Sequence, residues 1–215
     1  MRIISGDFRG RKINPPANMP HTRPTTDIAK EGLFNILQHR INLEGIKTLD
    51  LFGGTGSISF ELASRGATDI TIIEKDAVMH EFIKKNLEML KVENAKVLRL
   101  DVFAYLSTCN EQFDFIFAGP PYALGSIDEL PRIINERKLI AKNGFFVLEH
   151  TPRNAYEKYA GFSFQRNYGS TFFFIFLPML MKIIPTDTTA STFISHYLIN
   201  NCFQIYHRTA EHSFG

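Results

Sequence analysis

Six residues have the types and the spacing of a nucleotide-binding site. Three glycines follow an apolar segment that contains an acidic residue, and one further acid ends each of two later apolar segments. In chain order they are Asp50, Gly53, Gly54, Gly56, Glu74 and Asp101. Glycine lets the backbone pass close beneath a ligand, and the first N–H groups of a following helix are free to bind it. Glu74 could accept hydrogen bonds from two ribose hydroxyls and Asp101 from the amine of adenine. The set predicts a site for a cofactor that contains a nucleoside.

The spacing favours S-adenosylmethionine over a nicotinamide dinucleotide. The dinucleotide requires the pattern G-x-G-x-x-G/A, whereas Ser59 stands at the third position after Gly54 and Gly56. S-adenosylmethionine has no pyrophosphate, and acids help to hold its cationic and hydroxyl groups. We assign three flanking residues to the same site: Phe52, Lys75 and Val102. Taken singly, an acid after a strand is more often a helix cap, so the prediction rests on the ordered set.

A second candidate site is the turn FAGPPY at residues 117–122. Two prolines and a tyrosine just after an apolar strand are typical of a pocket that holds a flat ring. An amine on such a ring is a poor nucleophile, because its lone pair is delocalised, so hydrogen-bond acceptors must orient it. The carbonyl of Pro120 can accept, and Tyr122 can stack on a base turned out of its helix. We assign catalysis to Gly119, Pro120, Pro121 and Tyr122; a purely structural turn is the alternative.

Alternating strand and helix patterns over residues 25–177 predict how these sites are positioned. Strands are expected at 47–52, 69–74, 95–100, 113–118 and 144–150, with an antiparallel pair at 162–168 and 170–177. Helices are expected at 25–41, 55–66, 76–90, 102–108 and 126–140. The middle strands are apolar with little alternation, as in a parallel sheet covered on both faces. We therefore predict a doubly wound, Rossmann-like α/β fold with a mostly parallel, seven-stranded sheet, which binds ligands at the carboxyl ends of its strands.

Several finer expectations follow from the same patterns. Thr25 or Thr26 should cap the first helix and Asp76 the third. The apolar face of the first helix should carry Ile28, Phe34, Leu37 and Ile41. The run 172–176 should be a buried strand at one edge of the sheet. Glu149 and His150, at the end of the fifth strand, could line the second pocket or cap the next helix.

Positive charge is concentrated near the start of the chain. The net charge is only +2, but residues 1–40 contain seven Lys and Arg and three Asp and Glu. This imbalance suggests contact with a polyanion, although charge alone slightly favours the alternative, a solvated basic surface. The residues that would bind such a polyanion are Arg2, Arg9, Arg11, Lys12 and Arg23.

Composition suggests three segments: a basic arm at 1–24 that pairs as a hairpin around Gly6 and Asp7, a domain at 25–177, and a tail at 178–215. Cys109 and Cys202 lack metal-ligand spacing, and we expect no metal. The first residues lack the apolar stretch of a signal peptide, and the chain has no apolar run of membrane-spanning length. We expect a cytoplasmic, monomeric protein without membrane contact.

The chain resembles the RsmD family of 16S ribosomal RNA guanine-N2 methyltransferases from residue 1 to about 177. The resemblance lies in RIISGDFRGRKI at 2–13, RPTTDIAKEGLFNIL at 23–37, LDLFGGTGSISFELASRGA at 49–67, IEKD at 73–76 and FDFIFAGPPY at 113–122. It implies transfer of a methyl group from S-adenosylmethionine to a guanine exocyclic amine of 16S ribosomal RNA, within small-subunit particles. It also implies cofactor roles for Asp50, Gly54, Gly56, Glu74 and Asp101, and closure of Arg23-Pro24-Thr25 over the site.

The sequence departs from the family pattern at position 119, where the family normally has Asp and this chain has Gly. Losing one acceptor should cost about 1.5–3 kcal/mol, or about 10- to 150-fold in rate. The Pro120 carbonyl and a water remain as acceptors, and Asp114, inside the strand, should not substitute. Two alternatives stay open: a catalytically impaired RNA-binding assembly factor, and a methyltransferase that acts on another amine, adenine N6 or glutamine. The tail has no counterpart in the family.

Overall fold

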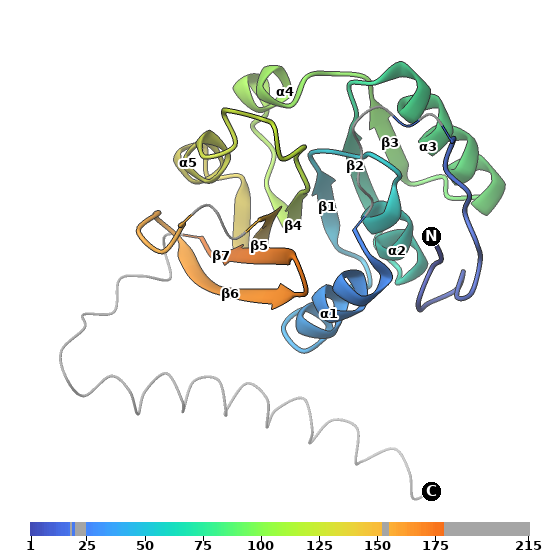
Figure 1. Ribbon diagram of the computed structural model, residues 1–215, viewed down its shortest axis with the longest axis horizontal. Coiled ribbons are helices and arrows are strands. Elements are labelled where there is room, and N and C mark those ends of the chain that lie inside the picture. Colours follow the sequence, from blue (N-terminus) through green and yellow to red (C-terminus); the bar gives the residue numbers. More distant parts are fainter. Residues whose placement is uncertain (18, 20–24, 152–154, 179–215) are drawn as a thin grey trace, which may run out of the picture. The chain divides into compact units, whose positions relative to one another are not determined.

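The computed structural model describes residues 1–17, 19, 25–151 and 155–178 (Figure 1). Arg23 and the tail from residue 179 onward therefore lie outside the described residues. Met1–Leu180 forms one compact unit. Within the described residues, no helix is long and apolar enough to cross a membrane.

A seven-stranded sheet with the order β3-β2-β1-β4-β5-β7-β6 forms the centre of the fold (Figure 1). The strands are β1 Lys47–Asp50, β2 Asp69–Ile73, β3 Ala95–Leu98, β4 Phe113–Ala118, β5 Ile140–His150, β6 Phe162–Tyr168 and β7 Thr171–Phe176. Strands β1 to β5 pair in parallel, and β7 pairs antiparallel with both β5 and β6. The predicted doubly wound, mostly parallel sheet is confirmed.

The two antiparallel strands β6 and β7 join the sheet in a different order from the one predicted. Strand β7 lies between β5 and β6, so β6 forms the edge. The expectation that 172–176 is an edge strand is wrong, although its burial is confirmed for Phe173 to Phe176. The physical reason is that β7 is buried on both faces, whereas every residue of β6 is half-buried or exposed, so that β6 tolerates an edge position.

Helices cover both faces of the sheet and divide the core in two. They are α1 Asp27–Gln38, α2 Ser57–Ser64, α3 Ala77–Leu90, α4 Val102–Thr108 and α5 Glu129–Glu136. One core layer contains side chains of α1, α2 and α3, including Phe34, Phe60 and Ile83, and the other contains Leu106 and Ile134 of α4 and α5 (Figure 1). This arrangement leaves the carboxyl ends of the parallel strands open to a ligand.

The helix caps agree with the prediction, whereas the exposure of Ile28 and the length of α5 do not. The side chains of Thr26 and Asp76 accept hydrogen bonds from the first turns of α1 and α3. Ile28 is 74% exposed, because its spacing from Phe34 and Leu37 places it on a different face of α1. Lys30 lies on the buried face and pairs with a buried acid on α2. Helix α5 is shorter than predicted, since Lys138 takes a left-handed φ of 56° and β5 begins at Ile140.

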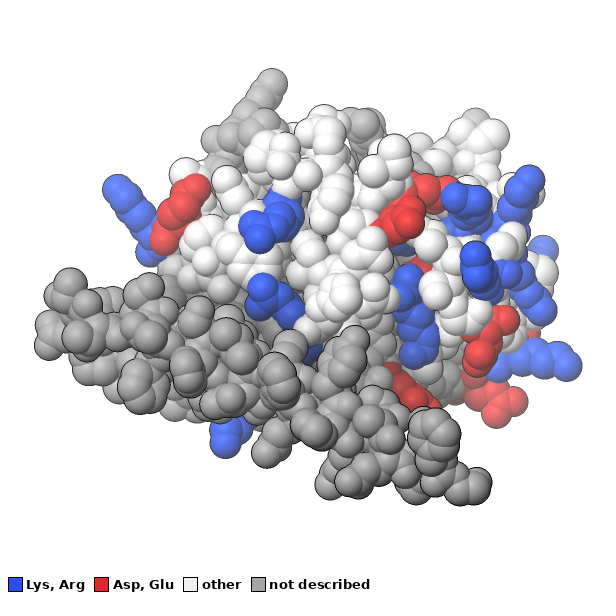
Figure 2. All heavy atoms as spheres, turned by 90° about the horizontal axis from the view of Figure 1, so that it is seen from below, with Lys and Arg blue, Asp and Glu red and all other residues white. Residues whose placement is uncertain are grey.

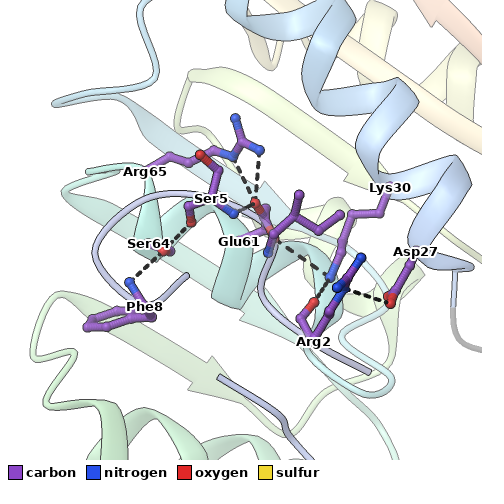
Figure 3. Close-up of polar contacts among 9 residues, drawn as sticks. Arg2, Ser5, Phe8, Asp27, Lys30, Glu61, Ser64 and Arg65 are labelled. Atoms are coloured by element: carbon purple, nitrogen blue, oxygen red, sulfur yellow. Dashed lines mark hydrogen bonds and ion pairs between the residues drawn. The ribbon is translucent and has the colours of Figure 1, made fainter. Parts of the chain in front are cut away.

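The N-terminal residues form the predicted hairpin and pack against α2. Arg2 and Lys12 form an antiparallel bridge, and Ile3 and Ile13 belong to the buried core. The carboxylate of Glu61 accepts hydrogen bonds from the backbone N–H groups of residues 4 and 5, at 2.8 and 3.0 Å (Figure 3). The hairpin is thus held against the domain at a fixed position.

Candidate active site

The predicted cofactor and catalytic residues surround one cavity of about 660 Å³ at the carboxyl ends of the parallel strands. The cavity is lined by all of them except Gly56: Asp50, Phe52, Gly53, Gly54, Glu74, Lys75, Asp101, Val102, Gly119, Pro120, Pro121 and Tyr122. The two motifs therefore face one space, although about 60 residues of chain lie between them. Its volume is in the range of small-molecule and cofactor sites.

Gly56 shapes the turn between β1 and α2 without lining the cavity. It adopts a left-handed φ of 73° at the N-cap of α2, and a Cβ there would lie 2.5 Å from the Phe60 ring. Its N–H donates to the carbonyl of Gly53 at 2.7 Å and closes the turn. A residue with a side chain would therefore disturb both the backbone conformation and the packing of α2.

Glu74 directly follows β2, and two backbone N–H groups hold its carboxylate in place. Its carboxylate accepts hydrogen bonds from Gly54 N–H and Asp76 N–H, both at 2.7 Å. Burial raises the pKa of Glu74, and these two N–H groups act against that shift. A carboxylate has about four acceptor positions, so this one can still accept bonds from hydroxyl groups of a ligand in the cavity.

Asp50 is buried at the end of β1, beneath the glycine turn. Ser59 Oγ donates to Asp50 Oδ2 at 2.7 Å, and Phe52 N–H donates to Oδ1 at 3.3 Å. Burial raises the pKa of Asp50 to about 7, although both donors oppose the shift. The serine that breaks the dinucleotide pattern thus holds the carboxylate of Asp50. A cationic ligand in the cavity would favour the ionised form of this carboxyl.

Asp101 faces the cavity and also caps the helix that follows it. It caps α4 by accepting hydrogen bonds from Phe103 N–H and Ala104 N–H. Lys75 Nζ lies 3.1 Å from its other oxygen. Partial burial acts to raise the pKa of Asp101, but Lys75 and the two backbone donors lower it overall. Lys75 is therefore placed against Asp101 and orients that carboxylate.

The turn after β4 lies against the end of β5. Tyr122 is 42% exposed and its ring lies edge-on to His150, with centroids 5.5 Å apart. Glu149 is buried, lines the cavity and accepts a 2.6 Å hydrogen bond from Thr25 Oγ1. Glu149 thus lines the pocket, which is one of the two roles expected for it. Asp114 accepts from Lys47 N–H at the opposite end of β1, too far from the turn to replace a side chain at 119.

Some residues that line the cavity could hardly be identified from the sequence. Arg99 and Phe103 flank Asp101, and Leu124 follows the proline turn, so only their neighbourhood pointed to the site. Thr25 was expected as a possible helix cap, and its bond to Glu149 could not be predicted, because 124 residues separate the two.

The basic residues of the hairpin lie on its surface. Arg9, Arg11 and Lys12 are exposed, with the Arg11 guanidinium above the Phe8 ring, and Arg2 lies 3.5 Å from Asp27. Arg23 lies outside the described residues. On the face shown in Figure 2, basic side chains are most numerous at the right margin, on the side where the hairpin and α3 lie in Figure 1, with acids among them. Among the described residues, no group of three or more His, Cys, Asp and Glu could hold a metal ion.

Fold and site together define a Rossmann-like methyltransferase of the S-adenosylmethionine-dependent class. The family model described as "Conserved hypothetical protein 95" matches residues 1–177. The chain is 33% identical over 154 residues to ribosomal RNA small subunit methyltransferase D of Escherichia coli, covering 72% of this chain and 76% of that protein. The protein of the same name from Haemophilus influenzae is 35% identical over 153 residues, covering 69% and 78%. The chain belongs to the RsmD family.

Solved structures agree with this assignment. The yhhF protein of Escherichia coli superimposes with a TM-score of 0.72 at 29% identity, covering 82% of this chain and 96% of that one. The Thermus thermophilus 16S rRNA guanine-N2 methyltransferase RsmC, solved with AdoMet and guanosine, has a TM-score of 0.58 at 26% identity. That match covers 72% of this chain and 44% of RsmC.

Proposed function

We propose that this protein transfers a methyl group from S-adenosylmethionine to the exocyclic N2 amine of a guanine in small-subunit ribosomal RNA. One observation carries the proposal: a single cavity joins the glycine turn and its carboxylates to the Pro-Pro-Tyr turn. Such a cavity can hold a nucleoside cofactor at one end and a flat base at the other. Relatives named for methylation of small-subunit ribosomal RNA support the choice of substrate.

The residues present fit S-adenosylmethionine. Glu74, fixed by Gly54 N–H, would accept the ribose hydroxyls, and Asp101 would accept the adenine amine. Asp50 would balance positive charge on the cofactor. The bound cofactor supplies an electrophilic methyl group on a sulfonium. The protein's part is to hold the acceptor amine in line and to exclude water.

The second turn would position the base. Tyr122 is exposed enough to stack on a guanine, and base–aromatic stacking is worth about 1–3 kcal/mol. The Pro120 carbonyl would accept one N–H of the amine and leave the nitrogen lone pair directed at the methyl group.

The basic hairpin would contact RNA phosphates. Arg9, Arg11 and Lys12 are exposed, and the hairpin that carries them is held by Glu61, so these cations have a fixed position relative to the cavity. Phosphate contacts of this kind position RNA without reading its sequence.

The test is methyl transfer from labelled S-adenosylmethionine to small-subunit particles that lack the modification, followed by digestion to nucleosides. We expect labelled N2-methylguanosine at one site. A Glu74→Ala variant, which should lose the cofactor, is the control. Label in an adenosine derivative would reassign the substrate amine. No transfer by protein that still binds S-adenosylhomocysteine would favour a non-catalytic assembly factor.

A further inference from the structure

A buried carboxylate lies where the catalytic turn has no side chain of its own. Gly119 directly follows β4, and Glu149 is the last residue but one of the neighbouring strand β5. The two strands are paired next to them, Ala118 with Leu148. A Cβ built on Gly119 would lie 3.6 Å from Glu149 Oε2. Both residues line the cavity, and Glu149 is only 6% exposed. The carboxylate of Glu149 is therefore next to the space that an acid at position 119 would enter.

The position of this carboxylate is fixed by its surroundings. Thr25 Oγ1, just before α1, donates a 2.6 Å hydrogen bond to Glu149 Oε2. The next residue, His150, contacts the Tyr122 ring edge-on. Thr25 thus holds the carboxylate of Glu149, and the residue next to Glu149 contacts the ring expected to hold the base.

We propose that Glu149 is a catalytic residue that accepts a hydrogen bond from the reacting amine, in place of the side chain that Gly119 lacks. The inference rests on the proposed function. A carboxylate is an acceptor only, and its bond to an N–H is stronger than that of a neutral carbonyl. Glu149 and the Pro120 carbonyl would then take the two N–H groups of the amine, one each. This arrangement would leave the lone pair of the nitrogen free for attack.

The same carboxylate provides a destination for the proton that the reaction releases. When an amine takes a methyl group from a sulfonium, the N–C bond forms with the nitrogen lone pair. The C–S bond breaks, its electron pair stays on sulfur, and one N–H proton must leave. The Glu149 carboxylate accepts that proton and passes it to water. Neither glycine nor proline can do this, because neither side chain holds a basic group.

The first test compares Glu149→Gln with the wild-type protein in single-turnover methyl transfer. The amide keeps the shape but lacks the charge and the basicity. We expect the rate to fall about 10- to 100-fold, because a hydrogen bond to a charged group is lost at the reacting amine. The dissociation constant for S-adenosylhomocysteine, measured by calorimetry, should change less than about twofold. Thr25→Val, which removes only the supporting bond, should lose less rate than Glu149→Gln.

A second-site change distinguishes acceptance by Glu149 from a structural role. Gly119→Asp in the Glu149→Gln background supplies a carboxylate from the other wall of the same space. Gly119 has no left-handed φ, and its added Cβ would approach the Phe117 ring at 3.1 Å, so that ring must shift by a few tenths of an ångström in both variants at this position. We expect Gly119→Asp to restore at least part of the lost rate. Gly119→Ala, which adds the Cβ without an acceptor, should restore none.

Three results would overturn the inference while the proposed function stands. The first is a wild-type rate of methyl transfer in Glu149→Gln, and the second is an equal loss of rate in Thr25→Val and Glu149→Gln. The third is an equal rate for the two double variants, in which Glu149→Gln is combined with Gly119→Asp or with Gly119→Ala. The melting temperature and cofactor affinity of each variant show that it is folded. An inactive wild-type protein would instead overturn the proposed function itself.

Discussion

Ser59 Oγ donates a 2.7 Å hydrogen bond to the carboxylate of Asp50 beneath the glycine turn. The bond stabilises the charged form of a carboxyl whose pKa burial raises to about 7. Ser59→Ala should therefore raise the pKa of Asp50 further and weaken S-adenosylmethionine binding at pH 7 by about fivefold to tenfold, since one hydrogen bond to a charged group is lost. Calorimetry at pH 6, 7 and 8.5 checks this, and the loss of S-adenosylmethionine affinity should become smaller as pH rises. Ser107→Ala, at an exposed serine on α4, is the control; a deficit independent of pH would contradict the explanation.

Asp50 should also make the stability of the ligand-free protein depend on pH. Its pKa is raised on folding, so between about pH 4 and 7 the folded state binds a proton that the unfolded state has lost. The contribution of this group to the free energy of unfolding therefore falls by up to about 1.4 kcal/mol per pH unit as pH rises through that range. Asp50→Asn removes the effect. In urea unfolding at pH 4.5, 6 and 7.5, the free energy of unfolding of the variant should rise relative to that of the wild type as pH rises. A constant difference between them would contradict the assignment.

Glu61 should hold the N-terminal hairpin to α2. Its buried carboxylate meets Arg65 at 2.9 Å and Lys30 at 3.7 Å, besides the N–H groups of Ile4 and Ser5 (Figure 3). Burial lowers the pKa of Lys30, and Glu61 acts against that shift. Glu61→Ala would leave the lysine buried without its buried counter-charge and should destabilise the protein by about 3–5 kcal/mol.

Hydrogen exchange gives a local measure of the same contact. In Glu61→Ala, the amides of residues 4 and 5 should exchange faster than those of β1. Adding Lys30→Met removes the buried cation and should recover part of the stability measured by urea unfolding. If the single variant kept wild-type stability, the role given to Glu61 would be wrong.

The hairpin cations should control the salt dependence of RNA binding. Arg9→Ala with Lys12→Ala removes two exposed charges without removing a side-chain contact that holds the hairpin in place. The slope of log K against log salt should become shallower by about 1.5, because each phosphate contact contributes about 0.7–0.9. Fluorescence anisotropy between low and moderate salt measures it. Lys142→Ala with Lys158→Ala makes the same charge change elsewhere on the surface and should leave the slope unchanged.

Much of the fold could be predicted from local patterns, because apolar runs, glycines and capping residues act over a few positions. Thr26 and Asp76 cap helices as their types suggest, and the parallel strands follow from apolar runs without alternation. The place of β7 could not be predicted, since strand order depends on which neighbour buries both of its faces. The exposure of Ile28 has a local cause, since its spacing from Phe34 places it on a different face of α1. The burial of Lys30 could not be predicted, because its partner Glu61 is far away in the sequence.

The sequence by itself predicted that acids between Asp50 and Asp101 line one space, because they stand at the ends of strands and such ends meet at one edge of a parallel sheet. It also showed that position 119 has no side chain to act as an acceptor. Only the tertiary structure decided that Glu149 lies beside that position, supported by Thr25. The contact joins three segments that are distant along the chain, and pairing of β4 with β5 brings two of them together. No local pattern contains that information, because the register between strands is set by packing of the whole sheet.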